Sequence, residues 1–182
     1  MKLGYADPPY LGQAKRHYAN DPSGIPAEEV DHYVLIEKLM REYDGWALSA
    51  SSPSSRAIWK IIDELTISVY AETKTVREAA WCKSFCSWKP SHRVQYTWEP
   101  VFFVPVRPKG SRNVPSVRDH LVCRMTMKKG THGAKPPEFN DWILNLLGYQ
   151  EGDEFHDLYP GTGGMAEAVK RWKPNVWKKK KE

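Results

Sequence analysis

The chain has 182 residues, with 27 lysines and arginines against 22 acids and a formal net charge of +5. This length suffices for one domain with a buried core, and no apolar run is long enough to cross a bilayer. Because the N-terminus lacks the basic start and apolar centre of a signal peptide, we expect a soluble cytoplasmic protein with no membrane partner.

Predicted strands and helices alternate along the chain, judged from the spacing of apolar residues and from turn and capping residues. In chain order they are a strand at 2–7, a helix at 25–43, a strand at 46–50, a helix at 57–65 entered through 51–54, strands at 76–85 and 94–106, an irregular segment at 107–131, a helix at 139–147, a strand at 154–158 and a helix at 165–172. This alternation predicts an α/β fold with a mostly parallel sheet flanked by helices. Such sheets bind ligands at the carboxyl ends of their strands.

The excess positive charge is concentrated in two segments. Between 107 and 131 one acid, Asp119, accompanies these basic residues: Arg107, Lys109, Arg112, Arg118, Arg124, Lys128 and Lys129. Such a cluster suits a phosphate backbone, so we predict that this segment binds nucleic acid. The second segment is the basic tail at 173–182, for which we favour a solvated terminus.

Three cysteines, Cys82, Cys86 and Cys123, are too few and too unevenly spaced to indicate a disulfide framework. Cys82 and Cys86 could bind zinc with His92 and His132, but the spacing is poor and no second cysteine pair follows. We therefore expect buried thiols and no metal.

Several further aromatic and charged residues have structural interpretations. Those expected in the core are Trp98, Phe102, Phe103, Trp142 and Leu146. Two charged residues stay open between roles. Glu99 either orients a site or makes a structural hydrogen bond, and Lys83 either contacts phosphate or ends a solvated strand.

The first candidate site is Asp7-Pro8-Pro9-Tyr10, which follows the first predicted strand. Asp7 and the carbonyl of Pro8 could each accept one N–H of an exocyclic amine on a nucleobase. Together they would direct its lone pair out of the ring plane, toward an electrophilic methyl group. Pro8 has a fixed φ, which holds its carbonyl stiffly, and Tyr10 could stack on a base taken out of the helix. The alternative is a simple turn with a surface aromatic.

The second candidate site is the glycine-rich turn at 157–164, between a predicted strand and a predicted helix. Gly161 and Gly163 let the backbone approach a ligand, and the helix that begins near Gly164 offers free N–H groups. The turn is neither G-x-G-x-x-G nor a P-loop. A tight structural connection is therefore the alternative.

These residues carry a family resemblance. Asp7-Pro8-Pro9-Tyr10 resembles the catalytic motif of S-adenosylmethionine-dependent amino-methyltransferases, which methylate adenine N6 or cytosine N4. The turn at 157–164 is similar to the cofactor turn of that family, with Tyr159 in place of a phenylalanine, and Lys135-Pro136 looks like the segment that precedes it. The order of these motifs matches the permuted, or beta, arrangement of DNA methyltransferases. Short stretches at 81–83, 98–101 and 133–136 also look like small phage-type and actinobacterial methylase-like proteins.

The resemblance implies a circularly permuted, Rossmann-like methyltransferase domain over 1–182, in which 107–131 is the target-recognition insertion. It implies that the residues around the target base are Asp7, Pro8, Pro9 and Tyr10. It implies that those around S-adenosylmethionine are Asp157, Tyr159, Pro160, Gly161, Thr162 and Gly163, with Lys135 and Pro136 lining the same pocket. Asp at the first catalytic position favours adenine N6, and Tyr at the fourth favours DNA over RNA.

One departure from the family pattern leaves alternatives open. The chain stops soon after the helix at 165–172, without the further strand whose acid holds the ribose of the cofactor. We therefore expect a truncated cofactor side, with the strand at 154–158 near a sheet edge where a homodimer or a partner could pair. The alternative functions are a catalytically inactive nucleic-acid-binding protein of the same fold, and methylation of cytosine N4, of RNA or of a free nucleobase.

Overall fold

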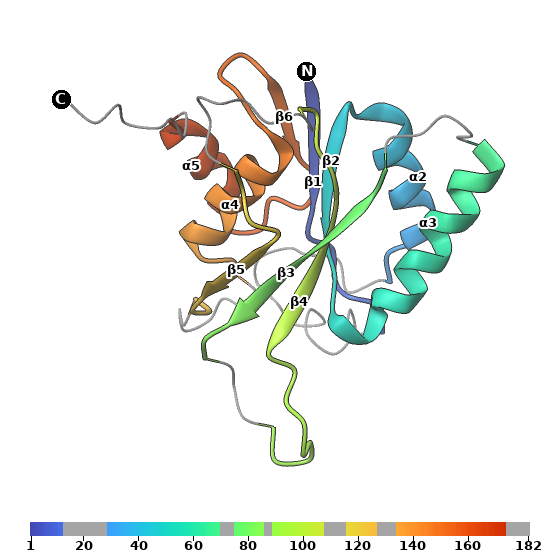
Figure 1. The fold of residues 1–182 in the computed structure, drawn as a ribbon, viewed down its shortest axis with the longest axis vertical. Helices are drawn as coiled ribbons and strands as arrows, with labels where there is room; N and C mark the ends of the chain where they lie inside the picture. Colours follow the sequence, from blue (N-terminus) through green and yellow to red (C-terminus); the bar gives the residue numbers. More distant parts are fainter. Residues whose placement is uncertain (13–28, 70–74, 86–88, 108–115, 127–133, 174–182) are drawn as a thin grey trace.

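The computed structural model describes residues 1–12, 29–69, 75–85, 89–107, 116–126 and 134–173 (Figure 1). The strands are β1 (Lys2–Ala6), β2 (Gly45–Ser49), β3 (Arg77–Lys83), β4 (Trp98–Val104), β5 (His120–Cys123) and β6 (Glu154–Asp157). The helices are α2 (His32–Glu42), η1 (Ser52–Ser54), α3 (Ser55–Val69), α4 (Pro137–Leu147) and α5 (Gly164–Arg171). The predicted alternation of strands and helices is confirmed.

One sheet joins the six described strands in the order β5-β3-β4-β2-β1-β6. β1 is parallel to β2 and to β6, and β3 is parallel to β5. β4 is antiparallel to both of its neighbours, so it alone among the described strands runs against the others. The predicted mostly parallel sheet is therefore confirmed, with one reversed strand near its middle.

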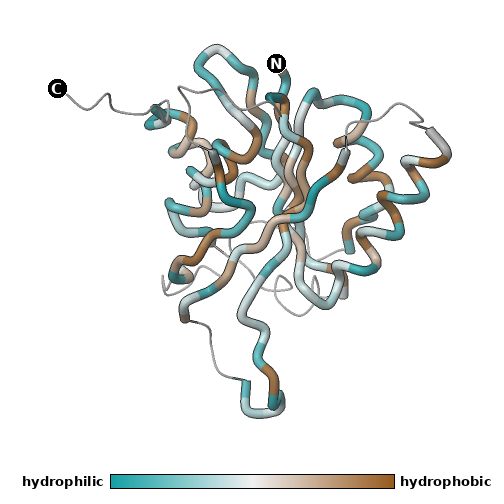
Figure 2. The backbone as a smooth tube through the Cα atoms, viewed as in Figure 1, coloured by the Kyte–Doolittle hydropathy of each residue, from teal (hydrophilic) through white to brown (hydrophobic). Residues whose placement is uncertain are grey.

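Helices cover both faces of the sheet, with α2 and α3 on one side and α4 and α5 on the other (Figure 1). Side chains of successive β4 residues point to opposite faces of the sheet, as they do along any strand. Phe102 packs with Ile36 and Ile58 in one apolar core, and Phe103 packs with Phe139 and Ile143 in the other. Hydrophobic residues, in brown, recur along the central strands and along the helices on both sides of the sheet (Figure 2). The predictions that Phe102 and Phe103 are core residues are confirmed.

Two strands far apart in the sequence lie side by side at the β1–β6 pair. Tyr5 of β1 lies opposite Asp157 of β6, and the N–H of Leu158 donates to the carbonyl of Tyr5 at 2.8 Å. Because the strands are parallel, their carboxyl ends lie side by side. The segment that follows β1 and the glycine-rich turn that follows β6 therefore start from neighbouring points.

Several element boundaries differ from prediction. The described part of the helix expected at 25–43 begins at His32, because the Asp31 carboxylate caps it by accepting the N–H groups of Tyr33 and Val34. Residues 13–28 lie outside the described residues. The strand expected at 94–106 is limited to β4, and Trp98 at its start is 38% exposed, so its expected place in the core was wrong.

The segment at 107–131, expected to be irregular, contains β5. This correction has a simple cause: His120 and Val122 are exposed while Leu121 packs against the core, an alternation that favours an edge strand. At the other edge, β6 pairs only with β1 among the described strands, so its predicted edge position is confirmed. None of the described helices combines the length and the apolar character needed to span a membrane.

Arg107 fixes the connection between the sheet and β6. Its guanidinium donates to both carboxylate oxygens of Asp153, at 2.7 and 2.9 Å, and to the carbonyl of Gly148 at 2.7 Å. These bonds hold the pKa of Asp153 down, at about 2. The structure therefore gives Arg107 a structural role and does not support its predicted contact with nucleic acid.

We expect Arg107→Met to lower the free energy of unfolding at neutral pH by about 1.5–3 kcal/mol, since it removes hydrogen bonds between charged groups. The low pKa of Asp153 stabilises the native state above the ordinary pKa near 3.8, and that stability is lost as the pH falls toward about 2. The acid dependence should therefore weaken in the variant. Urea unfolding between neutral and acid pH measures both effects, with the exposed Arg56→Met as control; equal losses in both variants would contradict the structural role.

Candidate active site

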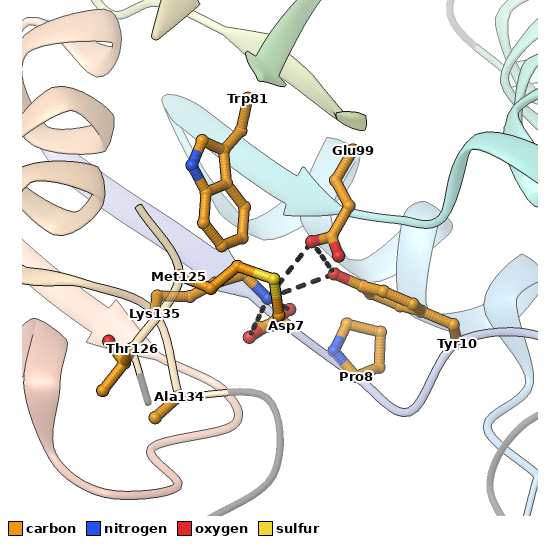
Figure 3. Close-up of a pocket in the computed structure, with 9 residues that line it drawn as sticks. All are labelled: Asp7, Pro8, Tyr10, Trp81, Glu99, Met125, Thr126, Ala134 and Lys135. Carbon is orange, nitrogen blue, oxygen red and sulfur yellow. Dashed lines mark hydrogen bonds and ion pairs between the residues drawn. The ribbon is translucent and has the colours of Figure 1, made fainter. Parts of the chain in front are cut away.

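The segment after β1 opens a pocket of about 90 Å³ at the carboxyl edge of the sheet (Figure 3). Its lining residues are Asp7, Pro8, Tyr10, Trp81, Glu99, Met125, Thr126, Ala134 and Lys135. Pro8 and Pro9 are buried, so the backbone that follows Asp7 is fixed both by its rings and by packing. The pocket contains three of the four predicted catalytic residues, while Pro9 lies behind them.

The ammonium of Lys135 lies against the carboxylate of Asp7. Its Nζ donates to Oδ1 and to Oδ2 at 2.8 Å each, and to the hydroxyl of Tyr10 at 3.1 Å. Burial raises the pKa of Asp7 above its ordinary value, and the attraction of Lys135 offsets only part of that effect. Lys135 therefore helps to keep Asp7 ionised in a site where burial favours the neutral acid.

Glu99 of β4 connects the cations of the pocket. Its Oε2 accepts from the Tyr10 hydroxyl at 2.7 Å and lies 3.7 Å from the Nζ of Lys135, and its Oε1 pairs with Lys83. Burial raises the pKa of Glu99, but the two ammonium groups outweigh it, so the pKa lies below its ordinary value. The two ammonium groups thus favour the ionised form of Glu99, which accepts the hydrogen bond that holds the Tyr10 ring at the pocket wall.

Trp81 of β3 forms another wall of the pocket (Figure 3). It is buried, it lies opposite Glu99 in the β3–β4 register, and its indole N–H donates to the sulfur of Cys123 at 3.0 Å. Tyr10 and Trp81 therefore present two anchored aromatic rings beside Asp7. A planar ring with an amine substituent suits such a site.

The glycine-rich turn starts where β6 ends. The Asp157 carboxylate accepts the N–H of Tyr159 at 3.2 Å, and burial, with a smaller contribution from the charge of Asp7, raises its pKa to about 6. Gly161 and Gly163 have φ values of +46° and +76°, which L residues adopt at a cost. The N–H of Gly163 donates to the carbonyl of Pro160 at 2.7 Å, which closes the turn before α5 begins.

The outer side of this turn is open. A Cβ at Gly163 would meet no atom within 4 Å, and one at Gly161 would meet only the carbonyl of Tyr159 at 3.9 Å. The N-terminus of α5 follows at once, and the side chain of its N-cap Gly163 offers no acceptor for the first N–H groups. Such a turn can receive a ligand on its open side, with backbone donors and one half-buried carboxylate.

The other predicted site residues divide into three groups. Lys135, expected at the glycine turn, has its ammonium at Asp7 instead, and Pro136 is the buried N-cap of α4. Arg124 is exposed next to the pocket residue Met125, whereas Arg118 is exposed at the opposite, amino end of β5. The remaining predicted basic residues, Lys109, Arg112, Lys128 and Lys129, lie outside the described residues, as does Cys86.

The sequence did not decide between alternative roles for two residues, Glu99 and Lys83. Glu99 lines the pocket, and the Lys83 ammonium pairs with it diagonally across β3 and β4, since the residue opposite Glu99 is Trp81. This proximity becomes visible only once the strand register is known. The structure supports neither of the two alternatives for Lys83, a phosphate contact or a solvated strand end, since its side chain is largely buried and its ammonium is engaged by Glu99. The described residues contain no cluster of three or more metal-ligating side chains.

The sequence matches no protein-family model and no curated protein. Among solved structures, the chain is similar to the M1.HpyAVI–SAM complex, with a TM-score of 0.58 and 14% identity, over 93% of this chain and 77% of that chain. It is also similar to M1.HpyAVI alone, with a TM-score of 0.50 and 16% identity, over 93% and 74% of the two chains. The chain has the Rossmann-like methyltransferase fold.

We expect Lys135→Met to raise the pKa of Asp7 further, because the variant keeps the burial and removes the nearest cation. The deprotonated form of Asp7 should then begin to be lost at a higher pH than in the native protein. Carboxyl-carbon NMR of the free protein follows this titration, with the exposed Lys60→Met as control. An Asp7 carboxyl that titrates at the same pH in both variants would show that Lys135 does not control its charge.

Proposed function

We propose that this protein is an S-adenosylmethionine-dependent methyltransferase that acts on the exocyclic amine of a DNA base, with adenine N6 as the favoured target. The observation that carries the proposal is the β1–β6 register, which sets Asp7 and Asp157 at neighbouring strand ends. The similarity of the fold to M1.HpyAVI, which was solved as a complex with SAM, supports it.

The glycine-rich turn suits the cofactor on chemical grounds. S-adenosylmethionine would supply an electrophilic methyl group on a sulfonium centre. The positive-φ glycines leave the outer side of the turn open to a ligand, and Asp157 offers a carboxylate to a cationic group. Of the predicted cofactor residues, Asp157, Tyr159, Pro160, Gly161, Thr162 and Gly163 belong to this turn. Lys135 belongs to the base pocket in our proposal, and Pro136 supports the backbone between the two.

On the base side, Asp7 and the carbonyl of Pro8 hold the two N–H groups of the target amine. Tyr10 and Trp81 flank its ring. The amine must first displace at least one of the two hydrogen bonds that Lys135 makes to Asp7, and Glu99, 3.7 Å away, offers that ammonium another acceptor. The raised pKa of Asp7 makes it a better acceptor for the proton that the amine loses on methylation.

The choice of adenine over cytosine and of DNA over RNA rests on the catalytic motif alone. Asp7 at the first position and Tyr10 at the fourth favour adenine N6 in DNA. The segment at 107–131 would serve as the recognition region, since Met125 and Thr126 line the base pocket and Arg124 is exposed beside them. Self-association through the exposed edge of β6 is a separate proposal.

A catalytically inactive nucleic-acid-binding protein is the second candidate. One observation favours it: Lys135 engages both oxygens of Asp7, the place that the target amine needs. Calorimetry with S-adenosylmethionine, with and without DNA, separates the two candidates. Absence of cofactor binding under both conditions would favour the inactive protein.

We expect Asp7→Ala to abolish methylation and to leave the fold and the cofactor affinity unchanged, because Asp7 contacts the amine and not the glycine-rich turn. Mass spectrometry of digested nucleosides measures N6-methyladenine and N4-methylcytosine in the same sample. Asp63→Ala, an exposed acid on α3, is the control. Retained methylation in the Asp7 variant would remove this residue from the mechanism.

We expect the affinity for S-adenosylmethionine to fall as the pH drops below about 6, because protonation of Asp157 removes its charge. The loss should approach tenfold per pH unit below that value. Isothermal titration calorimetry from acid to neutral pH measures it. Asp157→Asn should bind weakly at every pH, and a variant with the native pH dependence would show that another group titrates.

A further inference from the structure

The segment Lys89–Trp98, which we call the β4 arm, leads into β4 and projects beyond the body of the fold at the lower end of Figure 1. Its outer part exposes apolar and aromatic side chains. Val94 is 79% exposed and Tyr96 is 46% exposed. Exposed apolar groups on a projecting segment cost free energy in water and are typical of a contact surface.

The β4 arm is an ordered structure. The amide of Gln95 reaches back across it, accepting from the N–H of Lys89 at 2.9 Å and donating to the carbonyls of Lys89 and His92. The Tyr96 ring has two neighbours, with the His92 ring at 5.5 Å and the Nζ of Lys89 at 5.9 Å from its centroid. An aromatic ring is thus held in place with a cation beside it.

The charged residues around the β4 arm are all basic. Between Ser84 and Trp98 the sequence contains Lys89 and Arg93 and no acidic residue. Both cations are on exposed residues. An aromatic face combined with nearby cations is the combination that binds single nucleotides, with stacking on the base and ion pairing to the phosphate.

The β4 arm starts at the base pocket. Trp98 directly precedes Glu99, and the N–H of Lys83 donates to the carbonyl of Thr97 at 2.7 Å. Tyr96 is three residues from Glu99, so their Cα atoms are at most about 11 Å apart. This maximum distance corresponds to the length of about three stacked nucleotides, at a rise of about 3.4 Å each.

We propose that the β4 arm binds the DNA strand next to the target base. Tyr96 stacks on a nucleotide within about three positions of the target, and Lys89 and Arg93 contact the flanking phosphates. This inference rests on the proposed function for the identity of the strand. It adds a binding surface separate from the segment at 107–131, and that surface tolerates any sequence because every base offers a stacking face.

The ionic part of the proposal is tested by Lys89→Ala/Arg93→Ala. Fluorescence anisotropy of the full chain with a fluorescein-labelled DNA duplex, at several salt concentrations, gives the slope of log affinity against log salt. Loss of two phosphate contacts should reduce that slope by about 2. Arg56→Ala/Lys60→Ala, two exposed cations of α3, removes the same charge elsewhere and should leave the slope within error of the native chain. A change of equal size in both double variants would overturn the assignment.

The stacking part is tested by Tyr96→Ala. It should weaken binding about 5- to 150-fold without changing the salt slope, the effect of one lost base stack. Tyr96→Trp should restore binding, because it keeps a stacking face. Tyr33→Ala, an exposed tyrosine of α2, is the matched control. Native affinity in Tyr96→Ala would refute the stacking role.

The experiment separates this inference from the proposed function. If the native chain methylates DNA while all variants of the β4 arm bind DNA normally, the inference fails and the proposed function stands. If the native chain takes up no S-adenosylmethionine but its DNA binding depends on Tyr96, the proposed function fails and the contact stands. A change in sedimentation instead of DNA affinity would make the β4 arm a protein interface and would overturn the inference.

Discussion

The parallel pairing of β1 with β6 is the constraint on which the site depends. It joins residues from opposite ends of the described chain, Tyr5 and Asp157, across one strand boundary. A carboxylate of each motif thereby reaches the same edge of the sheet, and the charge of Asp7 contributes to the raised pKa of Asp157. Without this pair, the Asp-Pro-Pro-Tyr segment and the glycine-rich turn would be two unrelated loops. Because of this strand pair, the pocket at Asp7 and the glycine-rich turn lie next to each other.

The pocket beside Asp7 is held together by charge balance. Asp7 and Glu99 are two largely buried carboxylates, and the largely buried ammonium groups of Lys83 and Lys135 neutralise them. Buried charges persist only when they are paired and hydrogen-bonded, so these four side chains fix one another's positions. The Tyr10 hydroxyl bridges the carboxylate of Glu99 and the ammonium of Lys135, which orients its ring. The pocket is therefore ordered before any ligand enters.

The sequence was sufficient to predict the features that depend on local residue patterns. It was insufficient to predict the contacts that depend on the register between strands. Apolar spacing and turn residues located the strands, and the motif at Asp7 located the pocket. The roles of Glu99 and Lys83 required the β3–β4 pairing, which no local pattern contains. The role of Lys135 at the cofactor stays a prediction, and its contact with Asp7 was not predictable, because the direction of a long side chain depends on nearby anions. In the sequence, Arg107 belongs to a basic cluster. Its ion pair with Asp153, which is far away in the sequence, is visible only in the folded structure.

The charges at this edge of the sheet differ between the two motifs. Asp7 and Glu99 pair with the ammonium groups of Lys83 and Lys135, whereas burial raises the pKa of Asp157 to about 6. Of these three carboxylates, Asp157 has no ion-pair partner among the described residues, so no cation offsets the effect of burial on its pKa. One unbalanced negative charge therefore remains on the side of the glycine-rich turn. S-adenosylmethionine carries a sulfonium, an ammonium and a carboxylate, a net charge of one positive unit, so its binding would complete the balance that the four charged groups of the base pocket already have.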